Sequence, residues 1–501
     1  MEQTFGAILK KIAEETPDTV FLEEARTGKR VTGREFWNRI WKKAEEIRRA
    51  GIEPGARVMM MMDNSIAFAV NFFAITVSGC IVVPVNTGLK WKELRYILED
   101  TRAEAAFVQA EYAGVLKAAV PERDVFFGGM PEGGLEEAFC LLYRESPRDL
   151  PEGTAVLMYT SGTTGEPKGV MLSYENLLAK TKDIIEAHRL TASDRVLCVM
   201  PWFHINGLVI TLLTPLAAGE RIVIGGKFSV SRFWDYVEKY EITWFSGVPA
   251  MYSHMLARGI PEYGRHSSLR FARSASCALP RAVLGRFEEL CGIPVIESYG
   301  ITEGCAQITS NPLPPAVHKA GSVGLPYGNE IRVVKTDGTD AAAGENGEVW
   351  IRGKNITCGY YHKPEITEKA FTDGWFHSGD VGCLDEDGYL FLNGRIKELI
   401  NRSGEKFSPL EIDEALYQLP QVELAAAVGV PDPVYGEEVA CFIKKKTGAG
   451  LTEEEVKDWC KTQMAEYKVP RKVFFIEEFP QGGNGKIQRR KLLERYLRMS
   501  E

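Results

Sequence analysis

The 501-residue sequence lacks the cysteine spacing of a zinc site or of a disulfide framework. Its ten cysteines are scattered along the chain, and no two of them form a C-x-x-C pair. Zinc-binding modules and small disulfide-stabilised domains both need cysteines at short, regular spacing. We therefore expect neither kind of site, and we expect a cytoplasmic protein that keeps its thiols reduced.

The sequence also lacks an unbroken apolar segment long enough to cross a membrane. Its most apolar stretch, residues 66–85, is divided by Asn71, Ser78, Gly79 and Pro84. A membrane-spanning helix needs about 20 consecutive apolar residues. The stretch ends in β-branched residues, which is typical of a buried strand that follows a helix, so we expect no membrane span.

An excess of positive charge is absent as well. The 60 lysines and arginines are outnumbered by 68 aspartates and glutamates, which gives a formal net charge of −8. An acidic balance argues against nucleic acid as the main partner. The apolar share of 45% and the charged share of 26% are typical of a soluble globular protein, and the length indicates about two to four domains.

The sequence does contain a long alternation of short β-branched segments with helical segments. This pattern predicts an α/β fold of largely parallel sheets covered by helices. The candidate strands are residues 154–159, 195–200, 221–224, 243–248, 269–274 and 294–297. After about residue 320 the strands are closely spaced and joined by Gly/Asp turns, which predicts a smaller and more antiparallel β subdomain. Its candidate strands are residues 329–335, 347–353 and 388–393.

The last hundred or so residues have the pattern of a compact α+β unit. Helices are expected at residues 412–419 and 452–463. Strands are expected at residues 424–430, 438–444 and 472–477.

Residues 159–170 carry the strongest functional signal and read Tyr-Thr-Ser-Gly-Thr-Thr-Gly-Glu-Pro-Lys-Gly-Val. Glycines let backbone N–H groups face an anion, hydroxyls add neutral donors, and a lysine adds a charge. The candidate phosphate-binding residues are Thr160, Ser161, Gly162, Thr163, Thr164 and Lys168. A Walker A loop needs Gly-Lys-Ser/Thr at the start of a helix, whereas Pro167 precedes this lysine and Gly169 follows it. By composition alone a polar surface loop is the favoured interpretation of the segment.

The order of residues in this segment resembles the phosphate loop of the acyl-adenylate-forming enzymes. That superfamily includes acyl-CoA synthetases, firefly luciferase and the adenylation domains of peptide synthetases. Further segments resemble its other motifs in the same order, so the resemblance covers essentially the whole chain. It implies an N-terminal adenylation domain over residues 1–395, with the β subdomain from about residue 320, and a mobile C-terminal α+β domain over residues 396–501.

Two motifs resemble the acyl and adenine sites of the superfamily. Residues 201–207 (Pro-Trp-Phe-His-Ile-Asn-Gly) place His204 beside the acyl pocket, although a lone histidine is more often a core residue. Residues 297–303 (Glu-Ser-Tyr-Gly-Ile-Thr-Glu) imply that Tyr299 stacks on adenine, Thr302 contacts phosphate and Glu303 binds Mg²⁺ together with Thr160. In isolation this segment would be a strand that ends in a turn. The resemblance also assigns Ser276, Cys277, Ala278, Ser298 and Gly300 to the nucleotide site.

The next motif runs from residue 375 to residue 409 and implies a ribose site and a hinge. In the superfamily's pattern Asp380 accepts hydrogen bonds from both ribose hydroxyls, which the two oxygens of a carboxylate can do. Arg395 contacts ribose and phosphate, and Lys397 matches the hinge of the C-terminal domain. That domain would then bring Ser403, Gly404 and Glu405 toward the acyl site.

The last motif, residues 482–490, reads Gly-Gly-Asn-Gly-Lys-Ile-Gln-Arg-Arg. A basic segment near a C-terminus is usually a solvated surface run. By resemblance Lys486 is the catalytic lysine that bridges the carboxylate oxygen and the α-phosphate during adenylation. The implied catalytic residues are therefore Lys486, Thr302, Glu303 and His204.

These parts together imply an ATP-dependent carboxylate–CoA ligase, an AMP-forming acyl-CoA synthetase that uses ATP, Mg²⁺ and coenzyme A. A carboxylic acid would attack the α-phosphorus of ATP, and the acyl-AMP would then react with the thiol of coenzyme A. No carrier domain follows the last motif, which argues against a peptide-synthetase module, while a luciferase-type oxygenase stays an alternative. A catalytically silent nucleotide- or acyl-binding protein would be expected to lose Glu303, Asp380, Arg395 or Lys486, and all four are present.

The acid itself stays open among short dicarboxylic, aromatic and medium- or long-chain fatty acids. Residues 311–324 are similar to the branch that contains oxalate–CoA and fatty acid–CoA ligases. That branch usually has alanine where this sequence has Gly304, a difference that could enlarge the pocket, so oxalate is not assigned. The expected pocket walls are residues 203–204, 247–248, 274–278 and 299–305. The oligomeric state is also open, with a homodimer among the alternatives.

Overall fold

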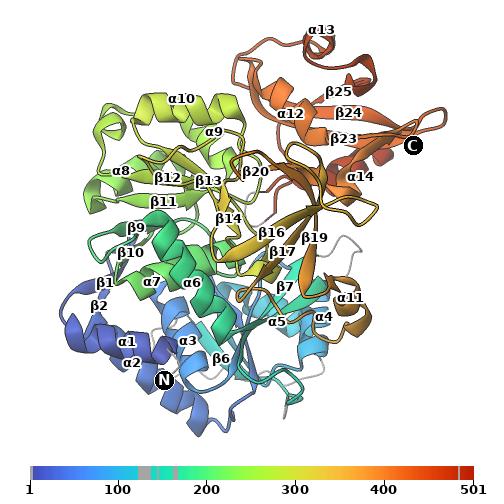
Figure 1. Cartoon of the computed structure of the whole chain (residues 1–501). Helices are drawn as coiled ribbons and strands as arrows, with labels where there is room; N and C mark the ends of the chain where they lie inside the picture. The colour runs from blue at the N-terminus through green and yellow to red at the C-terminus, as the bar shows by residue number, and fades with distance from the viewer. Residues whose placement is uncertain (1–3, 122–136, 144–145, 162–166, 483–485, 501) are drawn as a thin grey trace.

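The computed structural model describes residues 4–121, 137–143, 146–161, 167–482 and 486–500. Two large sheets form the lower and left part of the molecule, a small antiparallel sheet lies beside them, and the C-terminal part forms a lobe at the top right (Figure 1).

The nine-stranded sheet is parallel in its centre and antiparallel at its edges. Six neighbouring strands run parallel, and β2, β14 and β15 are antiparallel. In spatial order the strands are β15 (Leu325–Pro326), β14 (Thr309–Ser310), β13 (Val295–Tyr299), β12 (Phe271–Ser274), β11 (Trp244–Gly247), β9 (Arg195–Cys198), β10 (Arg221–Ile224), β1 (Val20–Glu24) and β2 (Arg30–Thr32). The predicted parallel sheet is confirmed for the centre, and the antiparallel edges were not foreseen.

The six-stranded sheet repeats this arrangement. Its four central strands are parallel, and β6 and β8 are antiparallel edges. The spatial order is β6 (Glu137–Leu141), β5 (Ala105–Gln109), β3 (Arg57–Met61), β4 (Ile81–Pro84), β7 (Thr154–Ser161) and β8 (Pro167–Ser173). The apolar stretch 66–85 forms helix α3 (Ile66–Val77) followed by β4, as predicted.

Helices cover both faces of both sheets because neighbouring residues of a buried strand point to opposite faces. Val196 of β9 packs into a core shared by the two sheets, whereas Leu197 packs into a second core on the outer face. The shared core contains α1 (Phe5–Glu15), α2 (Gly33–Arg49), α3, α6 (Tyr174–His188), the π-helix η2 (Asn206–Leu213) and α7 (Thr214–Ala218). The outer faces carry α8 (Val230–Tyr240), α9 (Pro249–Arg258) and α10 (Arg281–Cys291) on one sheet, and α4 (Trp91–Thr101) and α5 (Ala113–Ala119) on the other.

The antiparallel subdomain expected after about residue 320 is confirmed. Its order is β16 (Asn329–Val334), β17 (Gly347–Gly353), β19 (Trp375–Leu384) and β18 (Phe371–Thr372), and β20 (Leu390–Arg395) pairs with β19. The short helix α11 (Pro364–Lys369) precedes β18.

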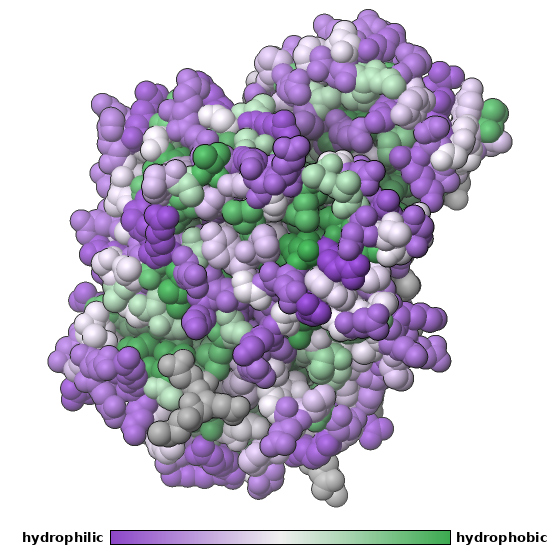
Figure 2. All heavy atoms as spheres, in the orientation of Figure 1, coloured by the Kyte–Doolittle hydropathy of each residue, from purple (hydrophilic) through white to green (hydrophobic). Residues whose placement is uncertain are grey.

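The C-terminal lobe contains the predicted helices and strands and two elements that the sequence did not indicate. The predicted elements are α12 (Pro409–Tyr417), β23 (Val422–Asp432), β24 (Gly436–Lys445), α13 (Glu453–Gln463) and β25 (Lys472–Phe475). The additional elements are a hairpin of β21 (Ile400–Arg402) and β22 (Glu405–Phe407), and helix α14 (Arg489–Ser500). Figure 2 shows this lobe projecting from the rest of the surface.

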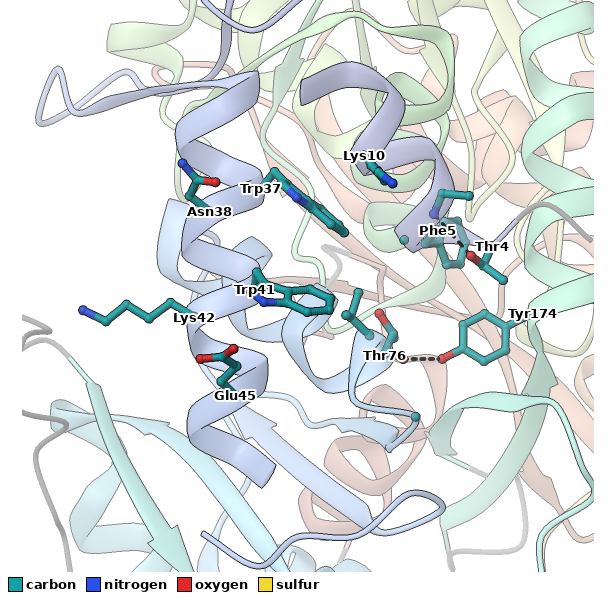
Figure 3. Close-up of a pocket in the computed structure, with 14 residues that line it drawn as sticks. Thr4, Phe5, Lys10, Trp37, Asn38, Trp41, Lys42, Glu45, Thr76 and Tyr174 are labelled. Atoms are coloured by element: carbon teal, nitrogen blue, oxygen red, sulfur yellow. Dashed lines mark hydrogen bonds between the residues drawn. The ribbon is translucent and has the colours of Figure 1, made fainter. Parts of the chain in front are cut away.

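A surface groove of about 810 Å³ lies between α1, α2 and the end of α3. Trp37, Trp41, Phe5 and Tyr174 line it, and the Tyr174 hydroxyl donates to the Thr76 carbonyl (Figure 3). None of the predicted site residues lines this groove, so it is not the nucleotide site. Within the described ranges, no helix is long and apolar enough to cross a membrane.

Candidate nucleotide and acid site

The described residues on either side of the phosphate segment belong to two antiparallel strands, and Lys168 lies in a strand and not at the start of a helix. Thr160 of β7 pairs with Lys168 of β8, and Ser161 pairs with Pro167. This arrangement agrees with the exclusion of a Walker A loop. Gly162, Thr163 and Thr164 lie outside the described residues, as does the side chain of Ser161.

Lys168 lies among charged residues from three separate motifs. Its Nζ is 5.1 Å from the centre of the Tyr360 ring. Burial lowers the pKa of Lys168, the positive charge of Lys397 lowers it further, and the negative charge of Glu303 raises it. The structure therefore brings the phosphate loop, the predicted hinge and the predicted metal ligand to one place, where two cations would favour an anion such as a polyphosphate.

Glu303 lies in the 3₁₀ turn η4 (Thr302–Gly304) directly after β13. Its Oε1 accepts a 2.8 Å hydrogen bond from the Tyr360 hydroxyl, and its carbonyl accepts one from the Thr357 N–H at 2.8 Å. Sequence reasoning missed Tyr360, which holds the carboxylate in place. Thr302 is half-buried at the start of the same turn.

The donors present fit Mg²⁺ bound largely through a substrate. The Glu303 carboxylate and the Thr160 hydroxyl are hard oxygen donors of the kind that Mg²⁺ prefers. No group of three or more His, Cys, Asp or Glu side chains suited to a metal occurs in the part of the chain that the structure describes. Mg²⁺ commonly completes its octahedron with phosphate oxygens and water, so such a sparse protein contribution is consistent with an ATP-bound ion.

Tyr360→Phe is expected to weaken magnesium dependence without changing the fold. Removing the hydroxyl frees the Glu303 carboxylate to rotate, and loss of such an orienting contact commonly weakens metal binding by about 10-fold or more. When pyrophosphate release is measured against Mg²⁺ concentration, the Mg²⁺ concentration at half-saturation should therefore rise by about 10-fold or more. Tyr361→Phe is the matched control, because the Tyr361 hydroxyl donates to Asp149 instead. An unchanged magnesium curve for Tyr360→Phe would argue against Glu303 as the ligand.

Asp380, Tyr299 and Arg395 form a second cluster. Asp380 is buried, and its two oxygens accept hydrogen bonds from the Tyr299 hydroxyl at 2.6 Å and from Arg395 Nε at 2.8 Å. The negative charge of Asp380 raises the pKa of Arg395, while burial and Asp380 together raise that of Tyr299. Each carboxylate oxygen has a second lone pair, so the cluster retains acceptors for ribose hydroxyls.

Two predicted contacts around β13 have a different physical basis in the structure. A Cβ at Gly300 would lie 1.3 Å from the Ala306 carbonyl oxygen, so the protein's own backbone requires this glycine. The Ser298 hydroxyl is buried and paired with the Ser310 hydroxyl at 3.0 Å. The opening expected beside Gly304 is also filled, because a Cβ there would lie 2.3 Å from Ile308 Cδ1.

The predicted acyl side is formed where η2 meets the ends of the parallel strands. His204 precedes η2, and its Nε2 is buried without a hydrogen-bond partner among the described residues. Burial lowers the pKa of His204 to about 4, so the ring is neutral at neutral pH. Asn206 Nδ2 donates to Ser276 Oγ at 3.3 Å, which links the histidine motif to the loop after β12. Cys277 and Ala278 follow on that loop, the latter exposed.

Lys486 faces this loop from the C-terminal lobe. Burial raises the pKa of the Cys277 thiol, and the positive charge of Lys486 is the largest effect that opposes the rise. The two parts are also joined by the Arg281 N–H, which donates to Glu414 Oε1 at 3.1 Å, and by His254 Nδ1, which lies 3.2 Å from Glu423 Oε1. The charge of Lys486 therefore acts on a loop that the motifs assign to the nucleotide site.

Ser403, Gly404 and Glu405 lie at the exposed turn of the β21–β22 hairpin. Gly404 has φ +91°, and a Cβ there would meet nothing within 4 Å. The structure leaves all three at the surface and does not bring them to the predicted acyl pocket. Lys397 lies in the exposed 3₁₀ turn η5 (Ile396–Glu398) between β20 and this hairpin.

Comparison with known proteins gives matches over the whole chain. Residues 9–361 match the family described as AMP-binding enzyme, and residues 411–486 match the AMP-binding enzyme C-terminal domain. Oxalate–CoA ligase from Arabidopsis thaliana is 36% identical over 510 residues, covering 99% of this chain and 99% of that protein. Sulfoacetate–CoA ligase from Cupriavidus necator is 36% identical over 497 residues, covering 98% of this chain and 97% of that protein. A crystal structure of an anthranilate CoA ligase in complex with anthranoyl-AMP has a TM-score of 0.89 at 27% identity, covering 100% of this chain and 98% of that chain.

Proposed function

The chain belongs to the AMP-binding enzyme family and is an ATP-dependent carboxylate–CoA ligase, and we propose that both half-reactions use the site around Lys168, Glu303 and Asp380. Its substrates are a carboxylic acid, ATP and coenzyme A, and it uses Mg²⁺. The observation that carries the residue assignment is the convergence of Lys168, Lys397 and Glu303, which come from three separate motifs, at one anion-binding place.

In the first half-reaction the acid attacks the α-phosphorus of ATP and pyrophosphate leaves. Lys168 binds the phosphates, Asp380 binds the ribose, and Lys486 stabilises the charge that builds between carboxylate and α-phosphate. Mg²⁺ held by Glu303 and Thr160 would offset the charge of the departing phosphates. Neutral His204 adds no positive charge at the acyl side, so the charge on the reacting carboxylate is left to Lys486.

In the second half-reaction the thiol of coenzyme A attacks the acyl carbon of acyl-AMP and AMP leaves. We place the pivot for this step at Lys397, with residues 1–395 as one domain and 396–501 as the other. Rotation would withdraw Lys486 and bring Gly404, now at the surface, to the acyl site. The cytosol is the proposed compartment, supported by ten cysteines that lack the spacing of a disulfide framework.

A carboxylic-acid panel tests the function directly. Purified protein, ATP and Mg²⁺ are mixed with each acid, and pyrophosphate release is measured with and without coenzyme A. A ligase should release pyrophosphate with its acid and should form AMP and thioester continuously only when coenzyme A is present. No acid-dependent release across short, aromatic and fatty acids would contradict the activity.

Gly404→Leu is expected to slow thioester formation by about 10-fold or more while sparing acyl-AMP formation. In the rotated arrangement a leucine would block the approach of the thiol past position 404, and it would be strained at φ +91°. Gly448→Leu is the matched control, since Gly448 is also exposed with φ +78° and a Cβ there would likewise meet nothing within 4 Å. Equal effects of the two substitutions on thioester formation would show that the thiol does not approach past Gly404.

A further inference from the structure

A buried arginine, Arg273, directly precedes the predicted pocket wall at residues 274–278 and was not singled out by the sequence motifs. It is the third residue of β12 and is only 1% exposed. Phe271, two residues earlier, packs into the core shared by the two sheets. Because alternate residues of a strand share a face, the Arg273 side chain points toward η2, which carries the histidine motif.

The guanidinium is held by neutral oxygens. Its Nε donates to Gln307 Oε1 at 3.3 Å, and its Nη1 donates to Asn206 Oδ1 and to Ser246 Oγ, each at 3.0 Å. Its Nη2 makes no hydrogen bond to the described residues. Three amide or hydroxyl acceptors orient a guanidinium, but none of them neutralises its charge.

Arg57, the other arginine that is buried among the described residues, has a carboxylate partner in Asp149. The half-buried Arg489 likewise pairs with Asp413. No carboxylate of the described part of the chain contributes to the environment of Arg273, and burial lowers its pKa to about 9. A buried charge without a counter-ion costs several kcal/mol, on the order of the penalty for one desolvated ion. Such a site is therefore incomplete unless an anion occupies it.

The position of Arg273 places that anion next to the acid. Ser246, which accepts from Arg273, directly precedes the predicted pocket wall at residues 247–248. Asn206 accepts from Arg273 through Oδ1 and donates to Ser276 Oγ through Nδ2. A single carboxamide group therefore separates the guanidinium from the loop that Lys486 faces.

We propose that Arg273 binds a second anionic group of the acid, so that the enzyme selects short acids with two negative charges. The inference rests on the proposed function, because it assumes that the acid lies between Lys486 and η2. One carboxylate of the acid reacts at the α-phosphorus, and the other, or a sulfonate, pairs with Arg273. Because one carboxamide lies between Arg273 and Ser276, the two anionic groups of the acid are close together.

The same geometry disfavours long or aromatic acids. A fatty chain would have to extend into the space that Arg273 and Asn206 fill, and it would leave the guanidinium buried beside hydrocarbon. A phenyl ring would meet the same polar side chains. Selection by a buried charge is strong, since sites built around a polar group reject analogues that lack its partner by far more than an apolar pocket rejects a missing methylene.

A purely structural role for Arg273 predicts different behaviour. Through Gln307 the arginine is connected to His188, whose Nε2 lies 3.1 Å from Gln307 Oε1, so its loss would loosen a buried network. Loosening would lower the rate with every acid by a similar factor. Recognition instead changes the ratio of rates between acids that differ only in the second charge.

The first experiment uses the unmodified enzyme and pairs of acids of equal size. Acid-dependent pyrophosphate release is measured with oxalate against oxamate and with malonate against malonamate, and sulfoacetate distinguishes a sulfonate from a carboxylate as the second anion. We expect kcat/KM to be at least about 100-fold higher for a dianion than for its monoanionic partner. Equal or higher values for the monoanions, or for a fatty or aromatic acid, would overturn the inference.

The second experiment compares Arg273→Met with Arg270→Met, each purified as the full chain. Arg270 lies three residues earlier and its Nε contacts Asp194 Oδ1 at 2.8 Å, so it is an arginine whose charge is already matched. Arg273→Met should lower the dianion-to-monoanion ratio of kcat/KM by about 100-fold, whereas Arg270→Met should keep the ratio of the unmodified enzyme. Should the methionine variant fail to fold, Arg273→Lys can be used instead. Lysine retains a positive charge but lacks the bidentate donors of a guanidinium, so this variant should keep part of the preference for dianionic acids.

The outcomes separate this inference from the function itself. Pyrophosphate release with monoanionic acids alone would leave the ligase in place and remove the role of Arg273. A ratio unaffected by Arg273→Met, with all rates lowered equally, would also remove it. An absence of release with every acid would overturn both.

Discussion

Lys486→Ala is expected to slow acid-dependent pyrophosphate release by about 100- to 1000-fold, the usual effect of removing a group that stabilises transition-state charge. The positive charge of this lysine acts on the loop after β12, where it opposes the rise in the pKa of the Cys277 thiol that burial causes. No other residue of the C-terminal lobe was predicted to be catalytic. Thioester formation from supplied acyl-AMP should proceed at nearly the unmodified rate, because bond formation to phosphorus is already complete.

The measurement is a pair of half-reaction assays on the same preparation. Lys491→Ala is the control, since Lys491 is an exposed lysine in α14, five residues along the chain. It should leave both half-reactions unchanged. An equal loss of the two half-reactions in Lys486→Ala would assign the lysine to binding or to stability rather than to adenylation.

Much of the fold follows from local pattern. The β-branched segments predicted strands whose bounds agree to within a few residues, and residues 221–224 and 347–353 match β10 and β17 throughout. Periodicity cannot assign strand direction, however. The antiparallel edges β2, β6 and β8 are set by which neighbour each segment meets, a long-range outcome that no single segment encodes.

The unpredicted elements have a similar cause. Residues 400–407 contain charged residues and a glycine, which are typical of a loop, yet Ser403 and Gly404 adopt positive φ and close a hairpin. Helix α14 was obscured by its run of basic residues, although Leu492 and Tyr496 lie on one face at helical spacing and are buried against the C-terminal sheet. The i, i+4 spacing of these two residues could have revealed it.

Within the site, motifs identified ligand-facing residues better than the residues that support them. Tyr360 holds Glu303 from 57 positions further along the chain, a separation that leaves no local signature. The steric need for Gly300 comes from Ala306, whose own positive φ brings its carbonyl against the glycine. Arg273 did carry a signal, because an arginine inside an apolar strand is rarely buried without a reason.

Lys397→Pro is expected to suppress thioester formation by about 100-fold or more while leaving acyl-AMP formation measurable. The residue lies in a 3₁₀ turn, whose φ of about −50 to −70° is close to the −65° that proline imposes. The arrangement in which Lys486 faces the loop after β12 should therefore persist. Rotation of the C-terminal lobe requires a large change in φ or ψ at the pivot, and proline forbids the change in φ.

Lys397→Ala separates the backbone from the charge. The Lys397 ammonium lowers the pKa of Lys168, so losing it alters the phosphate site even where the pivot stays free. Lys397→Ala should therefore slow adenylation modestly and still permit thioester formation. Lys397→Pro should slow adenylation to the same extent and also block thioester formation. Because the two variants share the loss of charge, their ratio in the thioester assay isolates the rotation. A ratio near one would place the pivot elsewhere in residues 394–399, with Gly394 the next position to test, since its φ of +116° already departs from that of its neighbours in β20.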